Sequence, residues 1–194
     1  MSKTFVIVDL EATCWDSADK NKPAGFVNEI IEIGAVRCNL EGDVIDEFDI
    51  FAKPKKFPII SPFCYQLTTI TQNDINTAVD AKTALEQFFI WALGEEHADA
   101  ENVKFVSWGM YDKNQFRKDL LLNDLDVEVI NDANHYSLKH YHSQWANVNK
   151  PKGIGLGRAC VLENIEFTGT AHRGIDDAKN IAKIFKKYID YFQD

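Results

Sequence analysis

The chain has 194 residues, 45% of them hydrophobic and 26% charged, which is typical of one globular domain, expected here over residues 1–194. Its formal net charge is −9, which argues against a protein that coats duplex nucleic acid, because such proteins are usually basic. An enzyme that holds a few nucleotides through metal ions stays open, because bound divalent cations can be the largest charges in a site.

The first quarter of the chain predicts three strands. Five of the six residues at positions 5–10 are apolar, which predicts a buried strand. Residues 28–40 alternate and are rich in Ile and Val, and residues 43–54 follow after Glu41 and Gly42, a short hairpin-type connection. Because short connections join antiparallel neighbours, we expect a three-stranded meander.

Helices and strands alternate in the rest of the chain. Thr71 followed by Asp74 predicts a helix start, and residues 81–93 have helical spacing. The further predictions are strands at 103–108 and 127–132 and helices at 112–122, 137–145, 155–165 and 176–192. A meander followed by β-α-β and terminal helices predicts an α/β fold, with a mixed central β-sheet flanked by helices.

The cysteines and the apolar stretches bear on the cellular compartment. The four cysteines, Cys14, Cys38, Cys64 and Cys160, are scattered without a Cys-x-x-Cys pair, which argues against a zinc cluster or a disulfide scaffold. No stretch approaches 18 uncharged apolar residues, and the first predicted strand begins almost at residue 1. We therefore expect a cytoplasmic protein with no signal peptide and no membrane contact.

Two carboxylates lie near the end of the first strand. Asp9 and Glu11 are two residues apart, so a strand points both side chains toward the same face. Two like charges held side by side cost free energy unless a cation or a shared proton relieves them. The alternative is a strand that ends at the surface with two solvated acids.

Further acids occur where two helices are predicted to start. Asp112 follows the strand at 103–108, and its alternative role is a helix N-cap, with Gln115 completing a capping box. His172 precedes Asp176 and Asp177, which fall in the first turn of the last helix. The alternative there is that the acids only stabilise the positive end of the helix.

All these acids could converge at one edge of the sheet, because ligands of open α/β sheets bind outside the carboxyl ends of strands. Several carboxylates without basic neighbours suggest a divalent-cation site, and their hard oxygen ligands suit Mg²⁺ or Mn²⁺. A two-metal carboxylate cluster serves in-line displacement at phosphorus.

The segments that carry these residues show a family resemblance. VDLEAT, SWGMYDKNQF and AHRGIDDAKNIA resemble the three exonuclease motifs of the DEDDh family of 3′→5′ exonucleases. SPFCYQLTTIT and HRGIDDAKNIAKI look most like the branch containing the animal 3′-exonuclease of histone mRNA and small interfering RNA and bacterial KapD-like proteins. The resemblance covers about residues 3–190 and implies a ribonuclease H-like fold.

The resemblance also implies roles for individual residues. The implied metal-binding acids are Asp9, Glu11, Asp112 and Asp177, which would hold two Mg²⁺ ions that Mn²⁺ can replace. His172 would be the general base, and Glu11 would be a second catalytic residue that approaches the terminal nucleotide. The implied substrate-binding residues are Ala12, Thr13, Phe63, Cys64, Leu67, Trp108 and His172. Ordinary packing is the alternative role for Phe63, Cys64, Leu67 and Trp108.

The implied activity is removal of nucleoside 5′-monophosphates from free 3′-ends of single-stranded RNA or DNA. RNA is preferred on the branch resemblance, with a DNA-trimming or proofreading-type exonuclease and a non-catalytic nucleic-acid-binding module as alternatives. The chain departs from the animal histone-mRNA enzyme, which has its Asp directly after the Trp, whereas three residues separate Trp108 from Asp112 here. We expect no appended RNA-binding domain like that enzyme's, and therefore simple single-strand trimming. The oligomeric state stays open.

Helical spacing separates the two acids of the last helix. The residues that follow Asp176 at this spacing are polar: Asn180, Lys183 and Lys187. Those that follow Asp177 are Ile181, Ile184 and Tyr188. We therefore expect Asp176 to face water and Asp177 to face the sheet.

Positive charge gathers in the C-terminal third of the chain. The residues are Lys139, Lys150, Lys152, Arg158 and Arg173. A solvated surface is the simplest interpretation of this modest patch.

Overall fold

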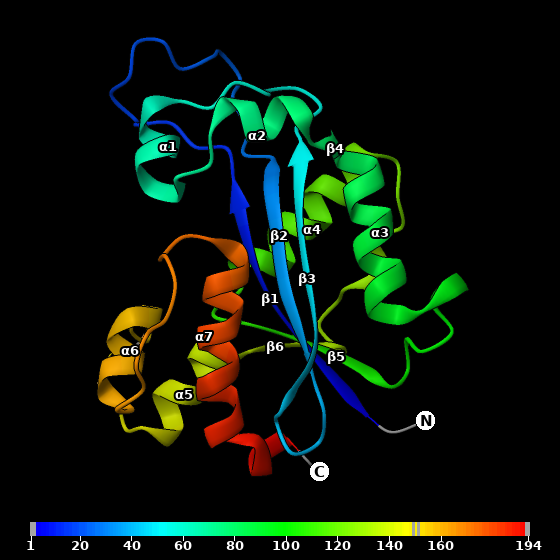
Figure 1. Cartoon of the computed structure of the whole chain (residues 1–194), viewed down its shortest axis with the longest axis vertical. Coiled ribbons are helices and arrows are strands. Elements are labelled where there is room, and N and C mark those ends of the chain that lie inside the picture. Colours follow the sequence, from blue (N-terminus) through cyan, green and yellow to red (C-terminus); the bar gives the residue numbers. More distant parts are fainter. Residues whose placement is uncertain (1–2, 149, 151, 193–194) are drawn as a thin grey trace.

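The computed structural model describes residues 3–148, 150 and 152–192. Within them one mixed sheet has the strand order β4-β3-β2-β1-β5-β6. The strands are β1 (Thr4–Ala12), β2 (Ile30–Cys38), β3 (Val44–Lys53), β4 (Val79–Asp80), β5 (Val103–Ser107) and β6 (His135–Ser137). Figure 1 shows the three long strands side by side through the middle of the molecule, with helices on either side.

Seven α-helices and three short 3₁₀ turns accompany the sheet in the described part of the chain. The α-helices are α1 (Pro62–Thr68), α2 (Gln72–Thr77), α3 (Ala81–Leu93), α4 (Tyr111–Leu122), α5 (Leu138–Trp145), α6 (Leu156–Leu162) and α7 (Gly174–Lys187). The 3₁₀ turns are η1 (Glu95–His97), η2 (Val127–Val129) and η3 (Ile189–Phe192). No helix of the described residues is long and apolar enough to cross a membrane.

The predicted meander is confirmed. β1 pairs with β2 and β2 pairs with β3, both antiparallel, while β5 lies parallel to β1 and β6 parallel to β5. Thr71 caps α2 in a capping box with Asp74, as its spacing predicts. The final helix, expected at 176–192, ends at Lys187, and the 3₁₀ turn η3 follows it.

The strand predicted at residues 127–132 is wrong. Residues Val127–Val129 form η2, and the third parallel strand is His135–Ser137. The Asp126 side chain accepts a hydrogen bond from the Glu128 amide, and the Asn134 side chain donates to the Val129 carbonyl, so side chains close this segment into turns. Val127, Val129 and Ile130 pack against the hydrophobic core. Their apolar side chains therefore alternate with polar ones as in a strand, although the segment pairs with no strand of the described residues.

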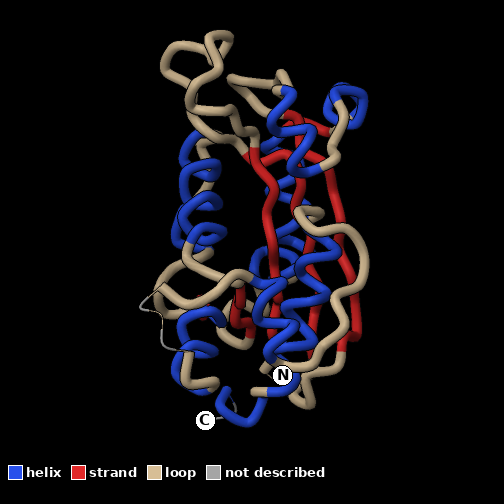
Figure 2. Tube along the Cα trace, turned by 90° about the vertical axis from the view of Figure 1, so that its left-hand side faces the viewer, coloured by secondary structure: helices blue, strands red, loops and turns tan. Residues whose placement is uncertain are grey.

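Alternation along β1 divides the core into two layers. Val6 and Val8 pack with α3 and α4, around rings such as Phe88 and Phe116. Residues on the other face, such as Phe5 and Ile7, pack against α7 and α5. Figure 2 shows the strands running along the long axis with helices around them. Asp9 and Glu11 continue the odd-numbered series, so they lie on the face that α7 covers.

Two glycines let the start of α7 approach the sheet. A Cβ added to Gly34 would lie 1.9 Å from the backbone nitrogen of Ile175, and one added to Gly174 would lie 3.0 Å from the Asp9 carbonyl oxygen. Neither position can carry a side chain without moving the helix. The first turn of α7 therefore sits directly on the part of β1 that holds the paired acids.

Candidate active site

A cavity of about 390 Å³ opens where the end of β1 meets the starts of α4 and α7. Its lining includes Asp9, Glu11, Asp112, His172 and Asp177. The structure thus brings together all five residues expected to carry the chemistry, although they come from three separate segments of the chain. Figure 1 shows the three contributing elements meeting near the middle of the molecule.

The two acids of β1 experience a strongly unfavourable environment for negative charge. Burial, together with the charges of Asp112 and Asp177, raises the pKa of Asp9 well above its ordinary value. Glu11 is 7% exposed, and burial followed by the charge of Glu32 raises its pKa to about 9. Because Glu11 is buried, the alternative of two solvated surface acids is wrong. A bound cation would stabilise the ionised form of both carboxylates.

Asp112 lies in the first turn of α4, but it does not cap the helix. The N-cap position is Met110, and one Asp112 oxygen instead accepts a hydrogen bond from the Leu10 amide at 3.1 Å. The proposed capping-box partner Gln115 is also engaged elsewhere, because it donates to Asp119 at 2.6 Å. Burial raises the pKa of Asp112 to about 6, although hydrogen bonds, first that from the Leu10 amide, oppose the shift. Asp112 therefore links the start of α4 to β1 and also lines the cavity.

His172 and Asp177 are coupled through the backbone at the start of α7. The His172 amide donates to one Asp177 oxygen at 3.1 Å, and His172 adopts a left-handed backbone conformation with φ 62°. The other Asp177 oxygen is buried and has no hydrogen-bond partner among the described residues. Candidate ligand atoms of Glu11, His172 and Asp177 lie within 4.8 Å of one another. An unpartnered buried oxygen in such a cluster is what a cation ligand requires.

Asp177 and Asp176 occupy different environments, as the helical spacing predicts. Asp177 is 8% exposed beside the sheet, and burial raises its pKa, whereas Asp176 accepts a hydrogen bond from the Thr170 amide at 2.8 Å. The expected water-facing stripe is wrong at Asn180, which is fully buried. Its side-chain oxygen accepts from the Thr168 amide and its nitrogen donates to the Thr168 carbonyl. The segment before α7 covers this side of the helix, which spacing within the helix cannot reveal.

A further acid, Glu32, was not singled out by the sequence. It pairs with Glu11 across the β1–β2 ladder and is fully buried. Its carboxylate accepts from the Arg173 guanidinium at 3.1–3.3 Å and from the Gly174 amide at 3.0 Å. Glu32 therefore ties β2 to the residue that follows His172. The sequence did contain a sign of this role, because Glu32 is the one acid of β2 and the residues on either side of it are apolar.

The expected substrate-binding residues divide into two groups. Ala12, Leu67 and Trp108 line the cavity with the acids, whereas Thr13, Phe63 and Cys64 do not. Thr13 is fully buried, and its hydroxyl accepts from the Glu29 amide at 3.0 Å. Cys64 is also fully buried, and its thiol donates to the Ala12 carbonyl at 3.7 Å. Phe63 is 40% exposed on α1.

Other residues that line the cavity were not expected at the site. They are Leu10, Cys14, Asn28, Gly109, Tyr111, Lys139 and Leu156. Leu10, Gly109 and Tyr111 lie within the motifs quoted above, next to or close to Asp9 and Asp112. No motif marks Asn28, Lys139 and Leu156, because their position depends on how the connecting segments fold over the sheet.

The sequence pattern of the RNase_T exonuclease family matches residues 6–185. The chain belongs to this exonuclease family. Among similar proteins, ERI1 exoribonuclease 2 of Homo sapiens is 30% identical over 212 residues, covering 95% of this chain and 28% of that protein. The probable 3′-5′ exonuclease KapD of Bacillus subtilis (strain 168) is 27% identical over 186 residues, covering 95% of this chain and 84% of that protein.

Solved structures support the same fold. The nuclease domain of 3′hExo, a DEDDh family member bound to rAMP, superimposes with a TM-score of 0.83 at 24% identity, covering 98% of this chain and 93% of that chain. E. coli Exonuclease I in complex with a dA16 oligonucleotide gives a TM-score of 0.71 at 16% identity, and the match covers 98% of this chain and 43% of that chain. The predicted ribonuclease H-like α/β fold and the DEDDh resemblance are confirmed. The chain spans less than a third of the length of human ERI1 exoribonuclease 2.

The site is chemically suited to the divalent cations on which this exonuclease family depends. Asp9, Glu11, Asp112 and Asp177 offer hard carboxylate oxygens to one cavity. The unpartnered Asp177 oxygen is free to accept a cation, and the raised pKa values of the acids show that negative charge here is unfavourable without one. The residues present therefore fit a divalent metal ion.

Proposed function

We propose that this chain is a 3′→5′ exonuclease that releases nucleoside 5′-monophosphates from a free 3′-end. The observation that carries the proposal is the convergence of four carboxylates and one histidine on a single cavity. Hydrolysis of a phosphodiester needs positive charge at the phosphate and a base for the attacking water. The acids answer the first need and the histidine answers the second.

Asp9, Glu11, Asp112 and Asp177 are the proposed ligands of two Mg²⁺ ions, which Mn²⁺ can replace. When bound, the cations would neutralise phosphate charge and favour ionisation of the attacking water. Glu11 is also proposed to contact the terminal nucleotide, and the proposal is supported by its position in the lining of the cavity beside Ala12. Both β1 acids are held by the strand itself, so their spacing is set before any ligand arrives.

His172 is the proposed general base. Its side chain is exposed at the cavity, so it can reach a water molecule beside the scissile phosphate. Its backbone amide donates to Asp177, which holds the main chain of His172 beside the acids. Histidine suits this role because its ordinary pKa of about 6.5 lies near the working pH. The base would accept a proton from water as the bond to the leaving 3′-oxygen breaks.

The proposed substrate is single-stranded RNA, with the 3′-terminal nucleotide in the cavity. The names of relatives such as ERI1 exoribonuclease 2 support RNA. DNA trimming is the second candidate, favoured by the likeness in fold to an exonuclease whose structure holds dA16. A non-catalytic binding module could lose any of the five site residues without unfolding. All five are present, which disfavours this alternative. We further propose one domain over residues 1–194, located in the cytoplasm.

Matched RNA and DNA oligomers, labelled at either the 3′-end or the 5′-end, test this proposal. With Mg²⁺ or Mn²⁺, the 3′-label should leave as a mononucleotide at once, while the 5′-label should pass through a ladder of shortening products. RNA should be degraded faster than DNA. Early release of internal fragments would indicate an endonuclease, and full activity in EDTA would contradict the metal-dependent reaction.

A further inference from the structure

The segment from Ala133 to Leu162 has an unusual charge composition. It contains no Asp or Glu, although the chain has 30 acidic residues. It does contain four cations, Lys139, Lys150, Lys152 and Arg158, while the other 17 basic residues share the rest of the chain with all of the acids. The segment comprises β6, α5, the following loop and α6. We call it the acid-free segment.

The acid-free segment forms one wall of the acid-lined cavity. Lys139 and Leu156 line that cavity together with the carboxylates. The indole nitrogen of Trp108 donates to the Ile154 carbonyl at 3.0 Å, which fastens the segment to the end of β5. A Cβ added to Gly153 would lie 2.9 Å from the Lys139 side chain, so the stem of Lys139 packs against the loop. A cation is thus held at the mouth of a site made of acids.

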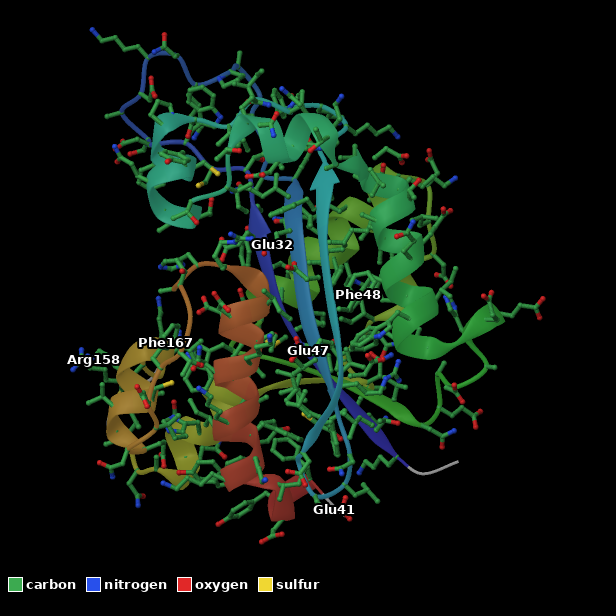
Figure 3. All side chains as sticks on the ribbon, viewed as in Figure 1. Glu32, Glu41, Glu47, Phe48, Arg158 and Phe167 are labelled. Atoms are coloured by element: carbon green, nitrogen blue, oxygen red, sulfur yellow. The ribbon has the colours of Figure 1, made fainter. Side chains whose placement is uncertain are left out.

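A second hollow continues from this wall. It has a volume of about 790 Å³, and its lining includes Ile154 and Arg158. Ile154 is therefore shared between the hollow and the attachment to Trp108 at the cavity. Lys152 and Arg158 are exposed, and Figure 3 shows Arg158 on the outer side of α6. The cations accordingly extend from the cavity outward along the surface of α5 and α6.

The cations of this segment are not neutralised within the fold. In the described part of the chain, Lys139, Lys152 and Arg158 form no ion pair. On the neighbouring helix α7 the situation differs, because Lys179 and Lys186 pair with acids of β3 and its hairpin. A surface kept free of acids, beside a site that must receive a polyanion, suits a phosphodiester backbone.

Helix α1 adds an apolar side chain to the lining of the cavity. Leu67 of α1 lines it, and Phe63 and Tyr65 of the same helix are 40% and 51% exposed. Figure 1 shows α1 and the α5–α6 pair on the same side of the molecule, above and below the start of α7. Phe63 and Tyr65 do not line the cavity, but they expose aromatic rings on the helix beside it. Proteins that bind single strands combine a positively charged groove with aromatic side chains on which bases stack.

We propose that Lys139, Lys152 and Arg158 bind the phosphates 5′ to the scissile bond, so that the substrate strand leaves the cavity along α5 and α6. This inference rests on the proposed exonuclease function and adds the path of the single strand to it. A dinucleotide ends before this path and gains nothing from it. A longer strand gains affinity that depends on salt, because each bound phosphate releases counterions.

The test compares a Lys152→Gln/Arg158→Gln double variant with the wild-type chain on a dinucleotide and on a single strand of about 20 nucleotides. The ratio of kcat/KM on the long substrate to that on the dinucleotide should fall about tenfold. The log–log salt dependence of kcat/KM on the long substrate should become shallower by about 1.4, since each lost phosphate contact removes about 0.7. A Lys82→Gln/Lys118→Gln variant is the control, since it removes the same charge from α3 and α4.

Each outcome decides between the alternatives. A lower ratio and a shallower slope in the first variant alone support the strand path. An unchanged ratio, an equal loss on both substrates, or an equal loss in the control variant overturns it. If wild-type protein releases no mononucleotide from either substrate, the proposed function itself fails, and the strand path fails with it.

Discussion

At the scale of single residues, the acids of the site oppose folding when no cation is present. Burial raises the pKa of Glu11 to about 9, above its value of 4.5 in an unfolded chain. A carboxyl whose folded pKa is raised stabilises the fold at low pH, and that stability is lost as pH rises toward the folded pKa. The metal-free protein should therefore become less stable between pH 7 and pH 9.

Glu11→Gln removes this cost. In EDTA at pH 8 the variant should be more stable than wild type by about 1–2 kcal/mol, or several degrees in Tm, while losing its activity. Thermal unfolding of both proteins across pH 7–9 measures the effect. A wild-type Tm that rises with pH in EDTA, or a less stable variant, would contradict the assignment of a strained carboxylate cluster.

The two neighbouring acids of α7 should differ sharply in catalysis. Asp177→Asn should lower kcat by about 10³-fold, or about 4 kcal/mol, because its unpartnered oxygen faces the other acids. Asp176→Asn should stay within about tenfold, under about 1.4 kcal/mol, because Asp176 only holds the segment before the helix. Steady-state rates of the two variants decide the matter. Greater loss in Asp176→Asn would reverse the assignment.

His172→Ala should lower the rate about as much as Asp177→Asn does, since it removes the proposed base. It should nevertheless keep most of its affinity for Mn²⁺, because the four carboxylates remain. Calorimetric titration with Mn²⁺ separates the two roles. A variant that no longer binds the cation would make His172 a ligand, as the proximity of its ring to Glu11 and Asp177 allows.

At the scale of elements, the start of α7 is set by its contact with β2. Glu32 holds Arg173 and Gly174, so its carboxylate fixes the turn between His172 and Asp177. Glu32→Gln should lower kcat by about 10–100-fold with little change in KM, because the metal ligands would be present but displaced, an effect of about 1.4–2.8 kcal/mol. Kinetics with and without excess Mg²⁺ should show a higher Mg²⁺ requirement.

An exposed ion pair on the same helix provides the control. Glu47 pairs with Lys179 of α7 at 2.7 Å, and the two side chains are 52% and 36% exposed. Glu47→Gln should leave kcat and the Mg²⁺ requirement close to wild type, because exposed pairs contribute little. Figure 3 shows Glu32 near the N-terminal end of α7 and Glu47 farther along the helix. Equal effects of the two variants would mean that Glu32 has no special positioning role.

Some elements were predictable from local patterns and others were not. The two-residue period of β1 placed Asp9 and Glu11 on one face, and the helical period of α7 separated Asp177 from Asp176. The strand expected at 127–132 failed, because side-chain hydrogen bonds close that segment into turns. Buried Glu32 and Asn180 depend on partners distant in sequence, which no local period encodes.

At the scale of the whole molecule, the order of the elements was sufficient to predict the antiparallel β1–β2–β3 meander, because tight connections force antiparallel neighbours, but not β4 or the position of β6. The shape of the cavity was less accessible to sequence reasoning. Thr13 and Cys64 fall inside the core instead of at the cavity, and Lys139 reaches it from α5. Such positions follow from how long connections fold across the sheet.

The central claim is that the cavity holds a free 3′-end and cleaves it with bound cations. The most direct measurement follows a 5′-labelled single-stranded RNA that ends in either a 3′-hydroxyl or a 3′-phosphate, with Mg²⁺ and with EDTA. We predict a ladder of products from the 3′-hydroxyl strand in Mg²⁺, and none from the 3′-phosphate strand or in EDTA. Equal degradation of both strands, or activity that survives EDTA, would contradict the account.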